Sequence, residues 1–323
     1  MLTQESFLRD ISRVLVWFPL RWTVQVISIP VSLFIFSVMG KIHFYGSRGK
    51  RRALKEVLGR MFQEGDSLDY DTITRRFLEN WYTHTLLPMI FKRFTPENVD
   101  RYINVEGEEK LKEALAQGKG CILIHGHLGP SQLPFVALSL KGYTINQISY
   151  LRPRENTSRI GKIVVKIKEQ CEKRIPITYI SAKSFMRPAF SALKRNEIVM
   201  TAGDGTGEGE FIGKYIPIKF LGGHLNFPIG PISLSRKTGA LLLPIFTIKV
   251  GLYKYKVIIE DQITLQNNGN KDLSKEVEKF TNLFESYVKK YPCHWYIMDS
   301  IQWLDPGNTG RATGRLQDCM VLR

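Results

Sequence analysis

The segment 121–132, CILIHGHLGPSQ, brings two histidines together in a setting where they could act on a substrate. A short apolar run ends there in a turn rich in Gly and Pro, which predicts a buried strand followed by a loop. Loops held by a rigid scaffold commonly present reactive groups. His125 and His127 have the same parity, so they share one face if the chain stays extended. An imidazole fixed at one nitrogen can take a proton from a hydroxyl with the other, which is the chemistry of acyl transfer by general base catalysis. The alternative is a hydrogen-bonded structural histidine.

Other catalytic designs do not fit. The segment 203–213, GDGTGEGEFIG, has neither the P-loop spacing nor a G-x-G-x-x-G register, since Glu208 stands where a glycine is needed. The chain has no G-x-S-x-G nucleophile elbow. Its four cysteines are far apart and form no C-x-x-C or Cys/His ligand spacing. We therefore expect no metal and no cofactor.

The elements around the histidine turn predict an α/β fold. Helical spacing covers 51–101, 106–118 and 275–290, while short apolar runs occur in YTINQISYL, EIVMTA, GALLLPIFTI and YKYKVIIED. Helices that alternate with such strands favour a central, mostly parallel or mixed sheet flanked by helices.

The N-terminal part carries an apolar stretch, 22–39, without a charged residue. Its length is close to the shortest that spans a bilayer as a helix, and basic residues flank it on both sides. We expect a hydrophobic anchor helix, as a single span or lying in the membrane plane. A buried helix of a soluble core is the alternative. The expected organisation is an anchoring segment, 1–45, a catalytic domain, 46–303, and a flexible polar tail, 304–323.

The charge is strongly positive, with 46 Lys and Arg against 30 Asp and Glu and a formal net charge of +16. Such a surface attracts anionic lipid headgroups, an acidic protein or nucleic acid. We expect no nucleic-acid partner, because no recognisable nucleic-acid-binding module accompanies the charge.

Five blocks in order resemble the lipid A biosynthesis (late) acyltransferases, part of the lysophospholipid acyltransferase superfamily. The resemblance extends to about Trp303. The blocks are Gly118–Gln132, Tyr150–Pro153, the strand-end Asp204, Ile216–Phe246 (IPIKFLGGHLNFPIGPISLSRKTGALLLPIF) and YPCHWYIMDSIQW at 291–303.

The resemblance implies a function and roles for individual residues. His127 would be the base that activates a hydroxyl of a membrane glycolipid or lysolipid. That hydroxyl would attack the thioester of an acyl carrier protein or acyl-CoA, at the cytoplasmic face of the bacterial inner membrane. Amides near Leu128 and Gly129 would hold the oxyanion. Arg152 and Arg174 would bind phosphate or phosphopantetheine, and His125 would line the substrate site.

One departure from the family pattern bears on catalysis. Gln132 occupies the position at which the family carries a carboxylate, five residues after His127. A glutamine can accept a hydrogen bond from the imidazole, but it supplies no negative charge. Either another acid compensates, with Asp204 and Glu208 as candidates, or the chain is a catalytically impaired, lipid-binding pseudoenzyme.

Overall fold

The computed structural model describes residues 7–62, 68–150, 157–183, 186–205, 212–265, 272–301, 303–305 and 308–313. The helices are α1 (Phe7–Leu15), α2 (Arg21–Val26), α3 (Ile29–Gly46), α4 (Arg48–Met61), α5 (Tyr70–Leu86), α6 (Glu108–Ala116), α7 (Leu133–Leu140), α8 (Arg159–Glu172), α9 (Arg187–Lys194), α10 (Gly230–Thr238) and α11 (Ser274–Lys290). A π-helical turn, η1 (Val16–Leu20), joins α1 to α2, and short 3₁₀ helices are η2 (Leu87–Arg93), η3 (Val99–Arg101), η4 (Pro292–His294) and η5 (Met298–Ser300). The strands are β1 (Ile103–Glu106), β2 (Cys121–His125), β3 (Ile145–Ser149), β4 (Thr178–Ser181), β5 (Ile198–Ala202), β6 (Tyr215–Phe220), β7 (Gly223–Pro228), β8 (Leu241–Lys249), β9 (Tyr255–Ile259), β10 (Trp303–Asp305) and β11 (Asn308–Thr313).

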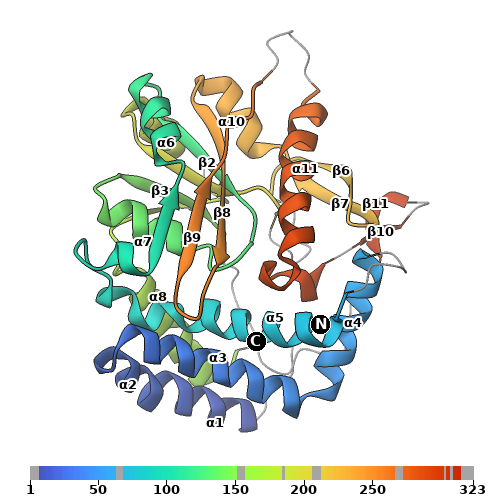
Figure 1. Cartoon of the computed structure of the whole chain (residues 1–323). Helices are drawn as coiled ribbons and strands as arrows, with labels where there is room; N and C mark the ends of the chain where they lie inside the picture. The colour runs from blue at the N-terminus through green and yellow to red at the C-terminus, as the bar shows by residue number, and fades with distance from the viewer. Residues whose placement is uncertain are drawn as a thin grey trace.

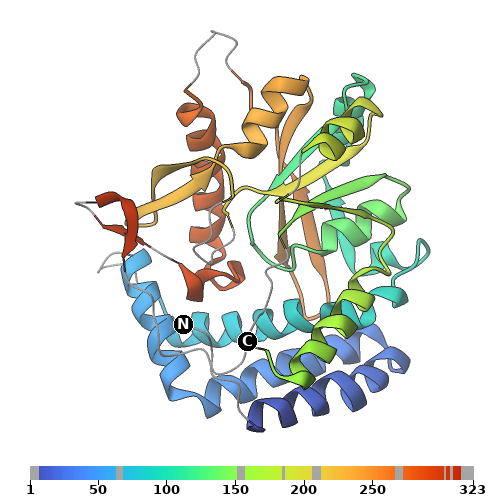
Figure 2. The same cartoon turned by 180° about the vertical axis from the view of Figure 1, so that it is seen from behind.

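A seven-stranded sheet forms the centre of the molecule, in the order β1-β9-β8-β2-β5-β3-β4. Strands β8, β2, β5, β3 and β4 run parallel, while β9 is antiparallel to β8 and pairs with β1 in parallel. Helices flank this sheet on both faces (Figures 1 and 2). The expected α/β fold with a mostly parallel or mixed sheet is confirmed.

Strand β2 lies in the interior of the sheet and is buried at all five positions. Its side chains alternate between two hydrophobic cores, with Ile122 and Ile124 on one face and Cys121 and Leu123 on the other. A strand buried on both faces reads as a continuous apolar run, which is why this one was recognisable from the sequence. The first core also receives α9, α10 and α11, and the second receives α6 and α7.

The helices α1–α5 lie together across one end of the sheet (Figure 1). Helix α3 is packed on α5, where Gly40 allows close approach to the α5 backbone, since a Cβ there would lie 2.5 Å from the Glu79 Cα atom. Ser37 Oγ also donates to Glu79 Oε2 at 2.9 Å. Among the described residues, α3 is the one helix long and apolar enough to cross a membrane, and 39% of it is buried inside the molecule.

The apolar stretch 22–39 is not one continuous helix. Helix α2 ends at Val26, and α3 begins at Ile29, with Pro30 in its first turn and an extended Ser28 before it. Proline has no backbone N–H, and in the first turn of a helix that N–H has no partner within the helix, so Pro30 suits a helix start. The segment expected to be an anchor therefore forms two helices, of which the second is partly buried inside the molecule.

The C-terminal region pairs further than the sequence indicated. Strands β10 and β11 form an antiparallel pair that reaches Thr313, so the boundary expected at 303/304 falls inside β10. Residues 314–323 lie outside the described part of the chain.

Candidate active site

The sheet itself brings His127 and Asp204 together. Strands β2 and β5 are parallel neighbours with His125 opposite Ala202, and each chain continues two residues beyond that pair. His127 and Asp204 therefore leave the same edge of the sheet side by side. The carboxyl ends of adjacent parallel strands are the usual place for a ligand site in α/β proteins.

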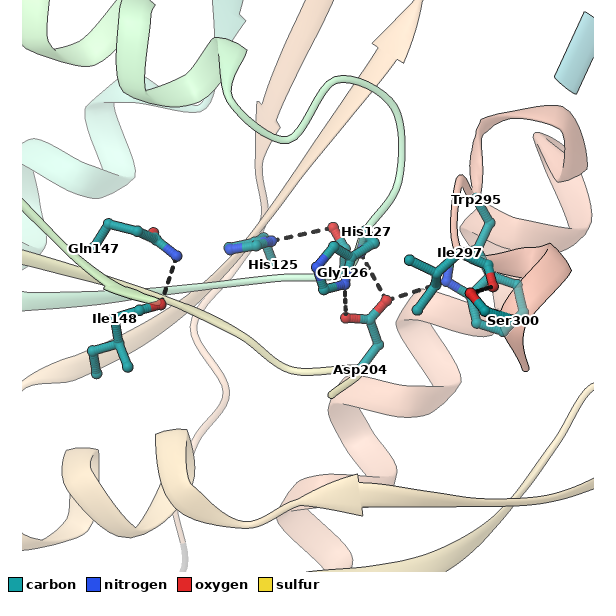
Figure 3. A network of polar contacts seen from close by, with 9 residues as sticks. All are labelled: His125, Gly126, His127, Gln147, Ile148, Asp204, Trp295, Ile297 and Ser300. Atoms are coloured by element: carbon teal, nitrogen blue, oxygen red, sulfur yellow. Dashed lines mark hydrogen bonds and ion pairs between the residues drawn. The ribbon is translucent and has the colours of Figure 1, made fainter. Parts of the chain in front are cut away.

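The two side chains form a hydrogen-bonded pair (Figure 3). His127 Nδ1 lies 2.7 Å from Asp204 Oδ1, and the His127 backbone N–H donates to Asp204 Oδ2 at 2.8 Å. A carboxylate only accepts, so Nδ1 carries the proton and Nε2 carries the lone pair of the neutral ring. The His127 side chain is 17% exposed and that of Asp204 is 1% exposed. This is the arrangement of a general base with its orienting carboxylate.

The environment keeps Asp204 ionised. Burial by itself raises the pKa of this carboxyl, but the charge and hydrogen bonds of His127 outweigh the burial and hold the pKa below its ordinary value. Asp204 can thus stabilise the imidazolium that forms when His127 takes up a proton.

The segment Cys293–Tyr296 closes the site from the other side. The Tyr296 N–H donates to the His127 carbonyl at 3.0 Å, and the Gly129 N–H donates to the His294 carbonyl at 2.7 Å. The Trp295 indole N–H reaches Asp204 Oδ2 at 3.1 Å. The Tyr296 ring meets the His127 ring edge to face at 5.1 Å between centroids. Segments more than 160 positions apart in the sequence therefore hold one loop.

The model of the bacterial lipid A biosynthesis acyltransferase family matches residues 4–304, nearly the whole chain. The chain belongs to this family. A search of curated proteins finds no match. In this member of the family, the histidine turn and the strand-end aspartate are in contact, and the other candidate residues are placed relative to them below.

Gln132 does not hydrogen-bond His127, although the sequence suggested that it could. Its Nε2 donates to Glu172 Oε1 of α8 at 3.1 Å, and the Nδ1–H of His127 is already taken by Asp204. Burial raises the pKa of Glu172, an effect that Lys168 and Gln132 only partly offset. Gln132 is the N-cap residue of α7, and its side chain reaches α8 rather than the His127 loop. Of the two acids expected to compensate, Asp204 hydrogen-bonds His127, and Glu208 lies outside the described residues.

Of the two backbone amides expected to hold the oxyanion, only that of Leu128 remains a candidate. The Gly129 amide is used by the His294 carbonyl, and Gly129 itself is required by the backbone, because its φ is +63° and a Cβ would meet the Thr247 carbonyl oxygen at 2.2 Å. Leu128 and Trp295 form an isolated antiparallel bridge in which the flanking residues make the hydrogen bonds. The Leu128 N–H therefore points away from Trp295. As an oxyanion donor, Gly129 is not supported by this geometry.

Two further histidines, His125 and His84, lie near His127, and both are neutral. Burial lowers the pKa of His125 to about 4 and that of His84 to about 3. The His125 ring lies 5.8 Å from the His127 ring, and His84 stacks on Tyr296 at 4.0 Å. His125 Nδ1 faces the Gly126 carbonyl, so the proton is on Nδ1, and its Nε2 is buried with no hydrogen-bond partner among the described residues. His125 is thus buried beside the site rather than displayed in the loop.

Neither arginine expected to bind substrate is placed at the site by the described residues. Arg152 lies outside the described residues, and Arg174 is exposed in the turn after α8, where its backbone N–H donates to the Cys171 carbonyl. Sequence reasoning gave no role to Trp295, Tyr296 or His84. Trp295 could have been found from the sequence, since it lies in the closing block of the family resemblance. His84 could not, because it is one residue of an ordinary amphipathic helix.

Proposed function

We propose that the protein transfers a fatty acyl chain from the thioester of an acyl carrier protein or acyl-CoA to a hydroxyl of a membrane glycolipid or lysolipid, of lipid A type by family, with His127 as the general base. The single observation that carries this is the 2.7 Å contact between His127 Nδ1 and Asp204 Oδ1. It leaves the Nε2 lone pair of a partly exposed imidazole available to a substrate hydroxyl.

The reaction balances with His127 alone as the proton carrier. Nε2 takes the proton of the acceptor hydroxyl while the oxygen attacks the thioester carbonyl carbon. The tetrahedral oxyanion is stabilised by the Leu128 N–H. Collapse breaks the carbon–sulfur bond, and the imidazolium returns its proton to the leaving thiolate. Asp204 stays ionised throughout and holds the imidazole in one tautomer.

The pseudoenzyme alternative rested on Gln132, and the observed contacts weigh against it. A pair that lacked its carboxylate would leave the imidazolium unstabilised, but here a buried, ionised Asp204 receives Nδ1–H directly. The Gln132 substitution removes a charge from the family position and leaves the His127 pair intact.

The proposed location is the cytoplasmic face of the inner membrane, with α1–α3 lying in the membrane surface. Most of the strongly exposed large apolar side chains in the described residues lie on these helices: Phe7, Leu8, Ile11, Leu15, Trp22, Val26, Val31, Phe34, Ile42 and Tyr45. Since α3 also packs on α5, an in-plane arrangement fits it better than a free span. The net charge of +16 favours both anionic lipids and an acidic carrier protein. In flotation with anionic vesicles, Phe34→Glu should weaken binding while Ser286→Glu on α11 leaves it unchanged; equal binding of both would contradict this location.

The function is tested by acyl transfer in vitro. Purified protein is supplied with an acyl-carrier-protein or acyl-CoA donor and a membrane lipid extract, and products are detected by mass spectrometry. We expect a lipid whose mass increases by one acyl group with the wild type and not with His127→Ala. Absence of any acylated product, or product formation unaffected by His127→Ala, would rule the proposal out.

A further inference from the structure

Among the residues that the structure describes, the Asp204 carboxylate accepts three hydrogen bonds, of which two come from His127 itself. Oδ1 accepts the imidazole N–H at 2.7 Å, and Oδ2 accepts the His127 backbone N–H at 2.8 Å and the Trp295 indole N–H at 3.1 Å. Two donors from the residue that must be oriented cannot fix the carboxylate independently, because they move with the His127 loop. Within the described part of the chain, Trp295 is the donor to Asp204 that comes from a residue other than His127 (Figure 3).

Aromatic residues of the core hold the indole ring in place. Trp295 is 2% exposed. Its ring lies edge to face with Phe220 of β6 at 5.4 Å and with Phe284 of α11 at 5.8 Å. A buried aromatic ring in such contacts has little rotational freedom. An indole N–H can only donate, so its position dictates where a carboxylate oxygen lies.

We propose that Trp295 is a positioning residue of the acyl transfer: its indole N–H anchors Asp204 Oδ2 and so fixes the carboxylate against which His127 is aligned. This inference rests on the proposed function. Trp295 touches no substrate atom in this account and acts through Asp204. A hydrogen bond to the charged form of a buried carboxylate also disperses its negative charge. Loss of the bond therefore leaves a carboxylate that is less well aligned and attracts the imidazolium proton more strongly.

The test compares Trp295→Phe with the matched control Trp303→Phe. Trp303 is another buried tryptophan, packed on Gly223 of β7. We expect Trp295→Phe to lower kcat about ten- to hundredfold, as removal of a hydrogen bond to a charged group does, with KM changed less than about twofold. The acid limb of its pH–rate profile should move to higher pH. The control should keep the wild-type kcat and profile.

If Trp295→Phe does not fold, a second variant and a second measurement still test the role of the indole N–H. Replacing Trp295 with benzothienylalanine exchanges the N–H for sulfur and keeps the two-ring shape, and the same loss of kcat is expected. In protein labelled with ¹⁵N-histidine, the Nδ1–H proton resonance of His127 should move in either Trp295 variant and stay in Trp303→Phe. Wild-type kcat, pH profile and resonance in the Trp295 variants would overturn the proposal. If the wild type makes no product, the proposed function fails, while the resonance still tests the contact.

Discussion

At the residue scale, the central feature is the carboxylate that His127 contacts. This carboxylate belongs to Asp204, whereas position 132, where the family carries a carboxylate, holds a glutamine. The sequence placed His127 correctly in a loop after a buried strand and named Asp204 as one of two acids that could replace the charge missing at Gln132. It could not choose between Asp204 and Glu208, because which of two loop acids meets the histidine depends on strand order. The pairing of β2 with β5 brings Asp204 into contact with His127, whereas Glu208 lies outside the described residues.

Restoring the family carboxylate at position 132 is therefore expected to do harm. In Gln132→Glu the new side chain faces Glu172, whose pKa burial already raises, and two carboxylates in that place repel each other. We expect no gain in acyl transfer and a loss of about 1–3 kcal/mol in the free energy of unfolding at pH 7, the usual penalty for an unsatisfied buried group. The control is Gln132→Met, which removes the hydrogen bond without adding charge. Urea unfolding and the acyl-transfer assay measure the two effects, and a strong rise in activity for Gln132→Glu would show that position 132 serves His127 after all.

At the element scale, the sequence indicated where helices form, but it did not indicate which elements they pack against. The apolar stretch 22–39 looked like one anchor, yet Pro30 starts a new helix and α3 packs on α5. Ser37 is buried against Glu79 of α5, and Ser32 is buried beside Val24 of α2. Composition alone was ambiguous, because a helix that is apolar nearly all round suits a membrane or a core equally.

Two glycines of α3 test this packing. Gly40→Ala places a Cβ 2.5 Å from the Glu79 Cα atom and 2.6 Å from the Leu78 carbonyl oxygen, so α3 and α5 must move apart. We expect the free energy of unfolding to fall by about 1–3 kcal/mol, as overpacking of a close contact does. Gly46→Ala, at the end of the same helix, has open space around its Cβ and should change that free energy by less than about 1 kcal/mol. Similar values for the two variants, measured by urea unfolding, would mean that α3 is not packed on α5.

At the scale of the whole molecule, the fold buries several histidines in neutral form. Burial lowers the pKa of His84 to about 3 and those of His125 and His294 to about 4, from the ordinary 6.5. The sequence indicated an α/β chain with a histidine loop, but not that His125 and His294 are buried and His84 is partly buried against Tyr296. His294, for example, accepts the Lys249 backbone N–H at Nε2, a contact between positions 45 apart.

These histidines make the stability depend on pH. Below about pH 6.5 the unfolded chain binds protons at these positions and the folded chain does not, so stability is complete above that pH and is lost as the pH falls toward 4. Each group contributes at most about 1.4 kcal/mol per pH unit in this range. His84→Phe keeps a ring against Tyr296 and removes one titrating group, so its free energy of unfolding should fall less steeply than that of the wild type between about pH 6 and 4.5. Identical slopes in urea unfolding would contradict the burial of a neutral His84.

The pairing of His127 with Asp204 is tested most directly by single-turnover acyl transfer with Asp204→Asn, in comparison with His127→Ala and the double variant. An amide keeps the shape of Asp204 but supplies no charge and permits the wrong imidazole tautomer, which in another histidine–aspartate pair costs about four orders of magnitude. We expect each single variant to lose about a thousandfold or more and the double variant to lose hardly more than either, because the two residues act as one unit. Wild-type turnover by Asp204→Asn, or losses that multiply in the double variant, would contradict the account.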